Sequence, residues 1–180
     1  MIYGVVGKYS SGKDTVADYL VEHGYPKFSF SEEIVEEHQR RYGIPPPDRE
    51  AFIQLADEWR ETEGEDVMAR KILKKIEDKN LRDAVIVSIR TPAELARLKT
   101  CERFKLVVID APVSLRYSRG LERKSMKDRV SFEEFKAQEH RESNAIGTKM
   151  NLNLIMEKPD VFLFNDGSIE DLHKELDELV

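Results

Sequence analysis

The sequence contains a single cysteine, Cys101, in 180 residues. One thiol cannot form a bridge within the chain, and a lone thiol in a chain of this size is typical of a reducing compartment. The sequence also lacks an apolar run of the roughly 18 to 20 residues that a membrane-spanning helix needs, and a basic stretch followed by an apolar leader at its start. We therefore expect a cytoplasmic protein without a membrane anchor.

The chain has no excess of positive charge either. Lysine and arginine number 29 and aspartate and glutamate number 35, which gives a net charge of −6. A field of this sign repels a polyanion, so general binding of nucleic acid is disfavoured. There is also no internal repeat and no linker rich in glycine or serine. These absences favour one domain over residues 1–180, with no nucleic-acid polymer as a partner.

Five short apolar runs alternate with segments of helical periodicity, at residues 2–6, 25–30, 84–89, 104–109 and 161–164. Continuous apolar, β-branched runs are typical of strands that are covered on both faces. Helix starts are marked by Asp48 and by pairs with capping-box spacing: Thr91 with Glu94, Ser131 with Glu134, and Ser168 with Asp171. The pattern predicts an α/β three-layer sandwich, a five-stranded parallel sheet between helical layers.

The segment between the first strand and the first helix reads Gly7-Lys8-Tyr9-Ser10-Ser11-Gly12-Lys13-Asp14-Thr15. The spacing of its two glycines and lysine is that of a phosphate-binding loop, and the strand–loop–helix context is the one that such a loop needs. Loop amides, the helix N-terminus and a lysine ammonium bind nucleotide phosphates, and glycines permit the close approach. The alternative, a plain glycine turn, explains less of the motif. We expect Gly7, Lys8, Ser10, Ser11, Gly12, Lys13, Asp14 and Thr15 to bind the nucleotide.

The position after the lysine departs from the usual motif. A serine or threonine hydroxyl commonly stands there as a ligand of Mg²⁺, and this chain has Asp14 followed by Thr15. The hypothesis is that Asp14, directly or through water, and Thr15 contact the metal.

From Gly7 to Leu20 the chain resembles the opening of dephospho-coenzyme A kinases and deoxynucleoside monophosphate kinases. It is similar in particular to archaeal proteins described as dephospho-coenzyme A kinase-like or adenylate kinase-related. Further resemblances follow in the same order at residues 29–43, 89–94, 108–112 and 164–168. The resemblance implies Mg²⁺-dependent transfer of the γ-phosphoryl group of ATP to a small phosphorylated acceptor, a (deoxy)nucleoside monophosphate or dephospho-coenzyme A. It also implies an acceptor-binding helical region over residues 31–80 and an arginine-bearing lid over residues 116–142.

The predicted lid carries three arginines, Arg116, Arg119 and Arg123, at a spacing that places them on one face of a helix. Together with Lys13, such a cluster would neutralise charge on the transferring phosphoryl group. The alternative is a solvated basic surface paired with neighbouring glutamates, and the clustering favours the catalytic interpretation.

The acceptor site is expected, by the resemblance, between the second and third strands. The candidates are Ser31, Arg49, Arg60 and Arg90. Arg90 is favoured because it follows a strand at the edge where open parallel sheets bind ligands, and a guanidinium suits phosphate oxygens. A surface helix-cap position is its alternative, and Arg49 and Arg60 could simply face solvent.

Two departures bear on catalysis. Relatives commonly carry an acid in the third strand where this chain has Val87 and Ser88, and an arginine where it has Val35. Asp14 or Asp110 would then have to supply the acidic group, although a structural role for Asp110 is equally open. These departures keep the alternative of a nucleotide-binding regulatory protein or an inactive kinase relative.

The last strand is followed by Asn165-Asp166-Gly167. The resemblance places Asn165 and Gly167 near the adenine, whereas any tight turn favours the same residues. Both interpretations stay open.

Overall fold

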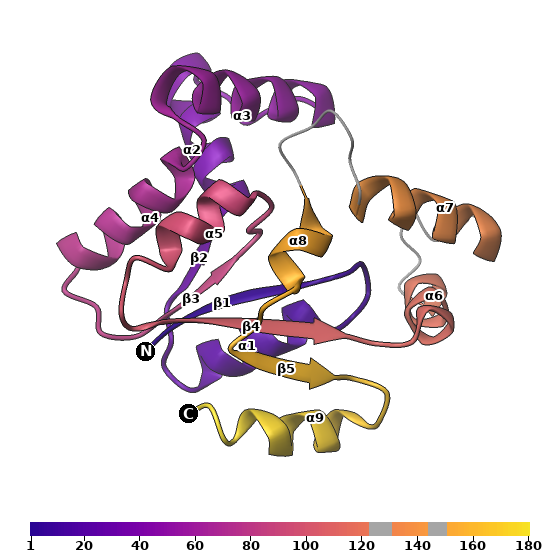
Figure 1. The fold of residues 1–180 in the computed structure, drawn as a ribbon. Coiled ribbons are helices and arrows are strands. Elements are labelled where there is room, and N and C mark those ends of the chain that lie inside the picture. The colour runs from indigo at the N-terminus through magenta and orange to yellow at the C-terminus, as the bar shows by residue number, and fades with distance from the viewer. Residues whose placement is uncertain (123–130, 144–150) are drawn as a thin grey trace.

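The computed structural model describes residues 1–122, 131–143 and 151–180. Five strands form one parallel sheet in the order β2-β3-β1-β4-β5 (Figure 1). The strands are β1 (Ile2–Gly7), β2 (Lys27–Ser29), β3 (Ala84–Val87), β4 (Phe104–Asp110) and β5 (Val161–Phe164). The predicted fold class, an α/β three-layer sandwich, is confirmed.

Helices cover both faces of the sheet. The described helices are α1 (Lys13–Glu22), α2 (Phe30–Tyr42), α3 (Arg49–Glu63), α4 (Val67–Asp78), α5 (Pro92–Leu98), α6 (Val113–Glu122), α7 (Phe132–Ser143), α8 (Leu152–Met156) and α9 (Ile169–Leu176). α1 and α9 lie on one face, and α4, α5 and α8 lie on the other (Figure 1). Among the described residues, no helix is long and apolar enough to cross a membrane.

The core consists of two apolar layers, because successive residues of a strand point to opposite faces. In β4, Leu106 and Val108 pack with α4, α5 and α8, while Val107 and Ile109 pack with α1 and α9. All four are fully buried. This two-sided burial is the reason that the central strands read as uninterrupted apolar runs.

The helix starts follow the capping signals. Thr91 with Glu94 and Ser168 with Asp171 form complete capping boxes, and the Asp48 carboxylate accepts a hydrogen bond of 2.8 Å from the amide of Ala51. These local predictions are confirmed, because each depends on groups only three residues apart.

One local expectation is wrong, and one helix was not expected. The second strand is shorter than 25–30, because Ser29 already has the extended backbone of an N-cap and Phe30 begins α2. The sequence also gave no expectation of α8, which begins at Asn151, whose side chain accepts a hydrogen bond of 3.0 Å from the amide of Leu154. A helix of five residues is too short for an apolar period to be recognised.

Helices α2 and α3 are joined by a cluster of charges around Glu37. The Glu37 carboxylate accepts hydrogen bonds from Arg40 at 2.6 and 2.9 Å and from Arg41 at 2.7 Å. Arg41 also donates to Glu58 on α3 at 2.8 Å. The hydrogen bonds from Arg40, and then those from Arg41, lower the pKa of Glu37 to about 2 against the opposing effect of burial.

We expect Glu37→Gln to lower the free energy of unfolding by about 1 to 2 kcal/mol at neutral pH, because solvent screens partners that are themselves partly exposed. The folded-state pKa of Glu37 lies below its ordinary value. The stabilisation is therefore complete above about pH 4.5 and is lost as the pH falls to about 2. Urea unfolding at several pH values, followed by the fluorescence of Trp59, measures the difference.

The control is Glu61→Gln, which removes the same charge from an exposed position on α3. Glu61 makes no ion pair with the described residues. It should change stability by less than about 0.5 kcal/mol. A difference between wild type and Glu37→Gln that stays constant from pH 7 to pH 2 would contradict the assignment.

Candidate functional site

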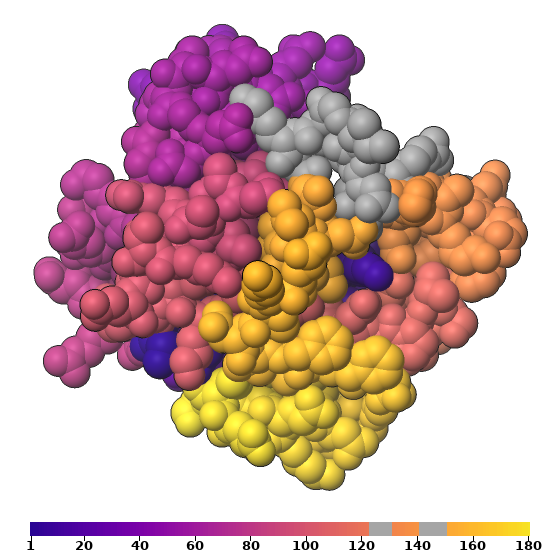
Figure 2. All heavy atoms as spheres, in the orientation of Figure 1, coloured from indigo at the N-terminus to yellow at the C-terminus, as the bar shows by residue number. Residues whose placement is uncertain are grey.

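The segment with the phosphate-loop motif, residues 7–13 (the phosphate loop), leaves the carboxyl end of the central strand β1 and enters α1. This is the edge of a parallel sheet at which ligands bind. In Figure 2, atoms of the indigo N-terminal segment are visible in a recess between the atoms of α8 and those of α6 and α7. The loop thus lies where α6 and α7 approach the sheet.

The backbone of the loop leaves no room for side chains at its glycines. A Cβ on Gly7 would overlap the main-chain oxygen of Ile109, and a Cβ on Gly12 would overlap the side-chain amide of Asn165. Gly12 also has a left-handed backbone with φ 108°, and Ser10 has φ 56°. Ser10 is not a glycine, and strained backbone conformations of non-glycine residues occur most often at functional sites.

Two buried hydroxyls in the loop need a partner. Ser10 is 3% exposed and Ser11 is fully buried, and neither Oγ atom has a hydrogen-bond partner among the described residues. Buried polar groups are nearly always satisfied, and the first amides of a helix also lack partners within the helix. Hydroxyl and amide donors around one backbone cradle fit the oxygens of a phosphate group.

The predicted metal contacts lie beside this cradle. Asp14 is exposed in the first turn of α1, and Thr15 follows it and is half-buried. Over the described ranges, no group of three histidine, cysteine or acidic residues could hold a metal by itself. The residues present fit a Mg²⁺ ion that takes most of its oxygens from a nucleotide and water, and one or two from the protein. Direct contact by Asp14 and Thr15 stays a prediction.

Asp110, at the end of β4, lies between two cations. Its Oδ2 atom is 3.5 Å from Nζ of Lys8, and its Oδ1 atom is 3.4 Å from Nε of Arg116. Oδ1 also accepts a hydrogen bond of 2.9 Å from the amide of Ala111. Asp110 is therefore next to the phosphate loop and is ion-paired, which leaves both its structural and its catalytic interpretation in place.

Arg116 has a buried guanidinium that is committed to other protein groups. Nε donates to the carbonyl of Ala111 at 2.8 Å, and Nη1 donates to the carbonyl of Tyr9 in the loop at 3.4 Å. Both terminal nitrogens donate to Glu139 on α7, Nη2 at 2.9 Å. These contacts hold α7 and the end of β4 to the loop, so a catalytic role for Arg116 stays a prediction.

Arg119 comes next on α6 and lies against Asn165. Its Nη1 donates to the main-chain oxygen of Asn165 at 3.0 Å, and its Nη2 donates to the side-chain oxygen at 3.2 Å. The side-chain amide of Asn165 donates to the carbonyl of Ser11 at 2.8 Å.

Arg123 lies outside the described residues. Gly167 follows in the turn before α9, and no described contact tests its predicted place near the adenine.

The residues predicted to bind the acceptor differ in their exposure to solvent. Arg90 is exposed after β3 and its side chain makes no hydrogen bond or ion pair with described residues. Its backbone is held on both sides, by Glu94, which accepts from its amide at 2.9 Å, and by Asn151, whose amide donates to its carbonyl at 3.1 Å. At the carboxyl edge of the sheet, Arg90 thus has a fixed backbone and a guanidinium without a partner in the described part of the chain.

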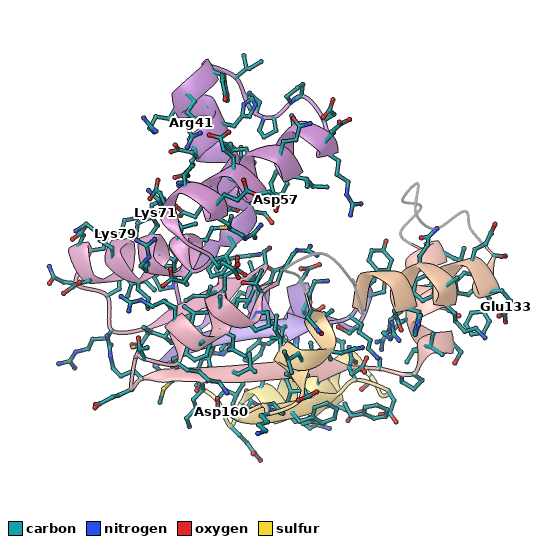
Figure 3. All side chains as sticks on the ribbon, turned by 45° about the horizontal axis from the view of Figure 1, so that its top comes forward. Arg41, Asp57, Lys71, Lys79, Glu133 and Asp160 are labelled. Carbon is teal, nitrogen blue, oxygen red and sulfur yellow. The ribbon has the colours of Figure 1, made fainter. Side chains whose placement is uncertain are left out.

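Arg60 does not face solvent. It is 7% exposed and donates to the fully buried Glu94 at 3.0 Å, which joins α3 to α5. Ser31 is half-buried in the first turn of α2, and Arg49 is exposed at the start of α3. In Figure 3, the labelled Arg41, Asp57 and Lys71 of α2, α3 and α4 lie well apart from Glu133 of α7.

The end of β3 carries a hydroxyl pair at the position where the resemblance implied an acid. Ser88 has a left-handed backbone with φ 66°, and its Oγ atom lies 3.3 Å from that of Ser29 at the end of β2. The register sets Gly4 of β1 against Ile86 of β3, which brings Ser88 alongside the last residues of β1. Neither the hydroxyl pair nor the ion pairs made by Glu94 and Glu139 could be found from spacing, because the partners are distant in sequence.

No family model matches the chain. It is 32% identical over 183 residues to a protein of Archaeoglobus fulgidus described as a UPF0200/UPF0201 protein, an alignment that covers 99% of this chain and 54% of that protein. The chain thus spans about half the length of this relative. It is 28% identical to a UPF0200 protein of Methanosarcina barkeri, over 99% of this chain and 94% of that protein.

Solved structures resemble the chain over nearly its whole length. The TM-score is 0.62 to TT1252 from Thermus thermophilus, at 23% identity over 99% of this chain and 95% of that one. It is 0.53 to the shikimate kinase from Acinetobacter baumannii in complex with shikimate, at 22% identity over 99% and 90%. It is 0.51 to the dephospho-CoA kinase from Campylobacter jejuni, at 18% identity over 99% and 94%. The chain has the fold of the P-loop kinases.

We expect Gly12→Ala to destabilise the protein by about 1 to 3 kcal/mol more than Gly24→Ala. Both glycines have left-handed backbones, but a Cβ on Gly24 would meet nothing within 4 Å, whereas one on Gly12 would meet the side chain of Asn165. Asn165 cannot turn away without losing its hydrogen bonds to Ser11 and Arg119. Urea unfolding of the two variants isolates this contact, and equal losses would show that the loop is not packed against Asn165.

Proposed function

We propose that this protein is an ATP- and Mg²⁺-dependent kinase of one domain, residues 1–180. Its acceptor would be a small phosphorylated molecule, a (deoxy)nucleoside monophosphate or dephospho-coenzyme A. The observation that carries the proposal is a pair of buried hydroxyls, those of Ser10 and Ser11, for which the described part of the chain offers no hydrogen-bond partner. They lie in a glycine-bounded loop at the carboxyl edge of the central strand. The similarity of the fold to a dephospho-CoA kinase and a shikimate kinase supports a small-molecule acceptor.

On the donor side, the loop amides, the Ser10 and Ser11 hydroxyls and Lys13 would hold the phosphates of the nucleotide. Bound Mg·ATP would supply the phosphoryl group, and its Mg²⁺ ion would neutralise part of the phosphate charge. Asp14 and Thr15 would orient the metal, and Lys8, within the loop, would add positive charge. Asn165 and Gly167 would border the nucleotide from the end of β5.

On the lid side, residues 116–142, Arg119 and Arg123 would stabilise charge that develops on the transferring group. Arg116 would act mainly through its hold on the carbonyl of Tyr9 and on Glu139. With no carboxylate at the end of β3, Asp110 or Asp14 would supply the acidic group. Phosphoryl transfer depends largely on positioning and on electrostatic stabilisation, so this arrangement can support it.

On the acceptor side, residues 31–80 would form the binding region, with Ser31 and Arg49 as contacts. Arg90 would bind the acceptor phosphate, because its guanidinium has no partner among the described residues and presents two N–H groups in parallel. Arg60 would act through Glu94, which holds the backbone of Arg90 in place.

One observation favours a second candidate, a nucleotide-binding regulatory protein or an inactive kinase relative. The end of β3 offers the hydroxyls of Ser88 and Ser29 in place of a carboxylate, and α2 carries Val35 in place of an arginine. Such a protein would bind ATP without turning it over.

The first test is coupled ADP release with Mg·ATP against a panel of ribo- and deoxynucleoside monophosphates and dephospho-coenzyme A. We expect turnover with one acceptor class, and a loss of at least about a hundredfold in Lys13→Ala, because a preorganised charge is removed from the phosphates. Lys174→Ala, at an exposed lysine on α9, is the matched control and should turn over normally. Tight ATP binding without turnover of any acceptor in the panel would favour the regulatory protein. Turnover by Lys13→Ala equal to that of wild type would refute the nucleotide site.

The acceptor site is tested by comparing the two ends of β3. We expect Arg90→Ala to raise the KM for the acceptor by about tenfold or more, which corresponds to the loss of a charge-assisted hydrogen bond, and to leave the KM for ATP within about twofold. Arg82→Ala removes an exposed arginine before the same strand, at the opposite edge, and should change neither constant. Equal effects of the two substitutions would rule out an acceptor contact by Arg90.

A further inference from the structure

Asn165 joins four separate parts of the chain at the end of β5. Its main-chain amide donates to the carbonyl of Asp110 at the end of β4, at 2.8 Å. Its side-chain amide donates to Ser11 in the phosphate loop at 2.8 Å, and its two oxygens accept from Arg119 on α6 at 3.0 and 3.2 Å.

The partners determine the orientation of the Asn165 amide. A guanidinium only donates, and a carbonyl only accepts, so Oδ1 must face Arg119 and Nδ2 must face Ser11. The side chain is 9% exposed, and it packs so closely on Gly12 that a Cβ there would overlap it. Asn165 is therefore held in one orientation by groups on both sides.

Arg119 depends on Asn165 for its position. Both hydrogen bonds that Arg119 makes to described residues go to Asn165, one from each terminal nitrogen, so Asn165 holds the guanidinium along one edge. Two of its five N–H groups are used, and three make no hydrogen bond with described residues. Arg119 is half-buried, so these remaining N–H groups are available beside the loop.

We propose that Asn165 is a positioning residue, which holds the guanidinium of Arg119 against the phosphate loop. Arg119 can contact a bound nucleotide only while Asn165 holds it there. The inference rests on the proposed function and assigns Asn165 a role other than contact with the base. Because one amide bonds to both Ser11 and Arg119, occupation of the loop and the position of Arg119 are coupled, and the coupling is reciprocal.

The test is a double-mutant cycle on the binding of Mg·ATP by the whole chain, measured by calorimetry for wild type, Arg119→Ala, Asn165→Ala and the double variant. We expect each single substitution to weaken binding about tenfold and the double variant to be no more than about twofold weaker than either. A tenfold non-additivity corresponds to about 1.4 kcal/mol of coupling. Losses that multiply to about a hundredfold, or an Asn165→Ala variant that binds like wild type, would overturn the inference.

Two further variants distinguish the positioning of Arg119 by Asn165 from a merely structural role of Asn165. Asn165→Asp keeps the shape and the acceptor for Arg119 but turns an oxygen toward the Ser11 carbonyl. In this background we expect weaker binding, with Arg119→Ala still costing a further severalfold. Asn151→Ala removes the cap of α8 and should lower the Tm without altering the effect of Arg119→Ala. An effect of Arg119→Ala that disappears equally in the Asn151→Ala background would refute a specific connection.

The outcomes distinguish this inference from the proposed function. Wild type that binds no Mg·ATP, with Lys13→Ala indistinguishable from it, refutes the nucleotide site and this inference with it. Wild type that binds Mg·ATP through Lys13, with independent effects at Asn165 and Arg119, refutes this inference alone.

Discussion

The close approach of the phosphate loop to its neighbours is the constraint on which the rest of the structure depends. Gly7 lies against the backbone of β4, and Gly12 lies against Asn165 at the end of β5, with no room for a Cβ at either position. The ends of β4 and β5 are thus part of the loop's own support, which explains why the contacts between Asp110, Asn165 and Ser11 converge there.

Burial divides the arginines of the candidate site into two kinds. Arg60 and Arg116 are buried, and each is paired with a buried or half-buried carboxylate, as a charge removed from water requires. Arg90 and Arg119 retain N–H groups without partners among the described residues. The first pair holds α3 and α7 to the carboxyl edge of the sheet, and the second pair is available to a ligand. Arginines of one site are therefore either paired with carboxylates or left with N–H groups that no described residue accepts, and burial decides which.

Much of the fold could be predicted from the sequence. The central strands were recognised because burial on both faces requires uninterrupted apolar residues, and helix starts were recognised because Asp48, Thr91 and Ser168 cap groups three residues away. The predictions fail where a local pattern is too short to be recognised or fits both a strand and a helix. Phe30 fits an apolar strand as well as a helix start, and α8 has too few residues to show a period.

The sequence by itself determined the phosphate loop, the strands and most of the helix ends, because each depends on residues within a few positions of one another. Only the tertiary structure decided which polar groups from distant parts of the chain meet. Arg60 pairs with Glu94 across 34 positions, Arg119 with Asn165 across 46, and Asn165 with Ser11 across 154. Spacing carries no information about such pairs, since they form only when the parallel strands bring their carboxyl ends to one edge and the helices pack against it.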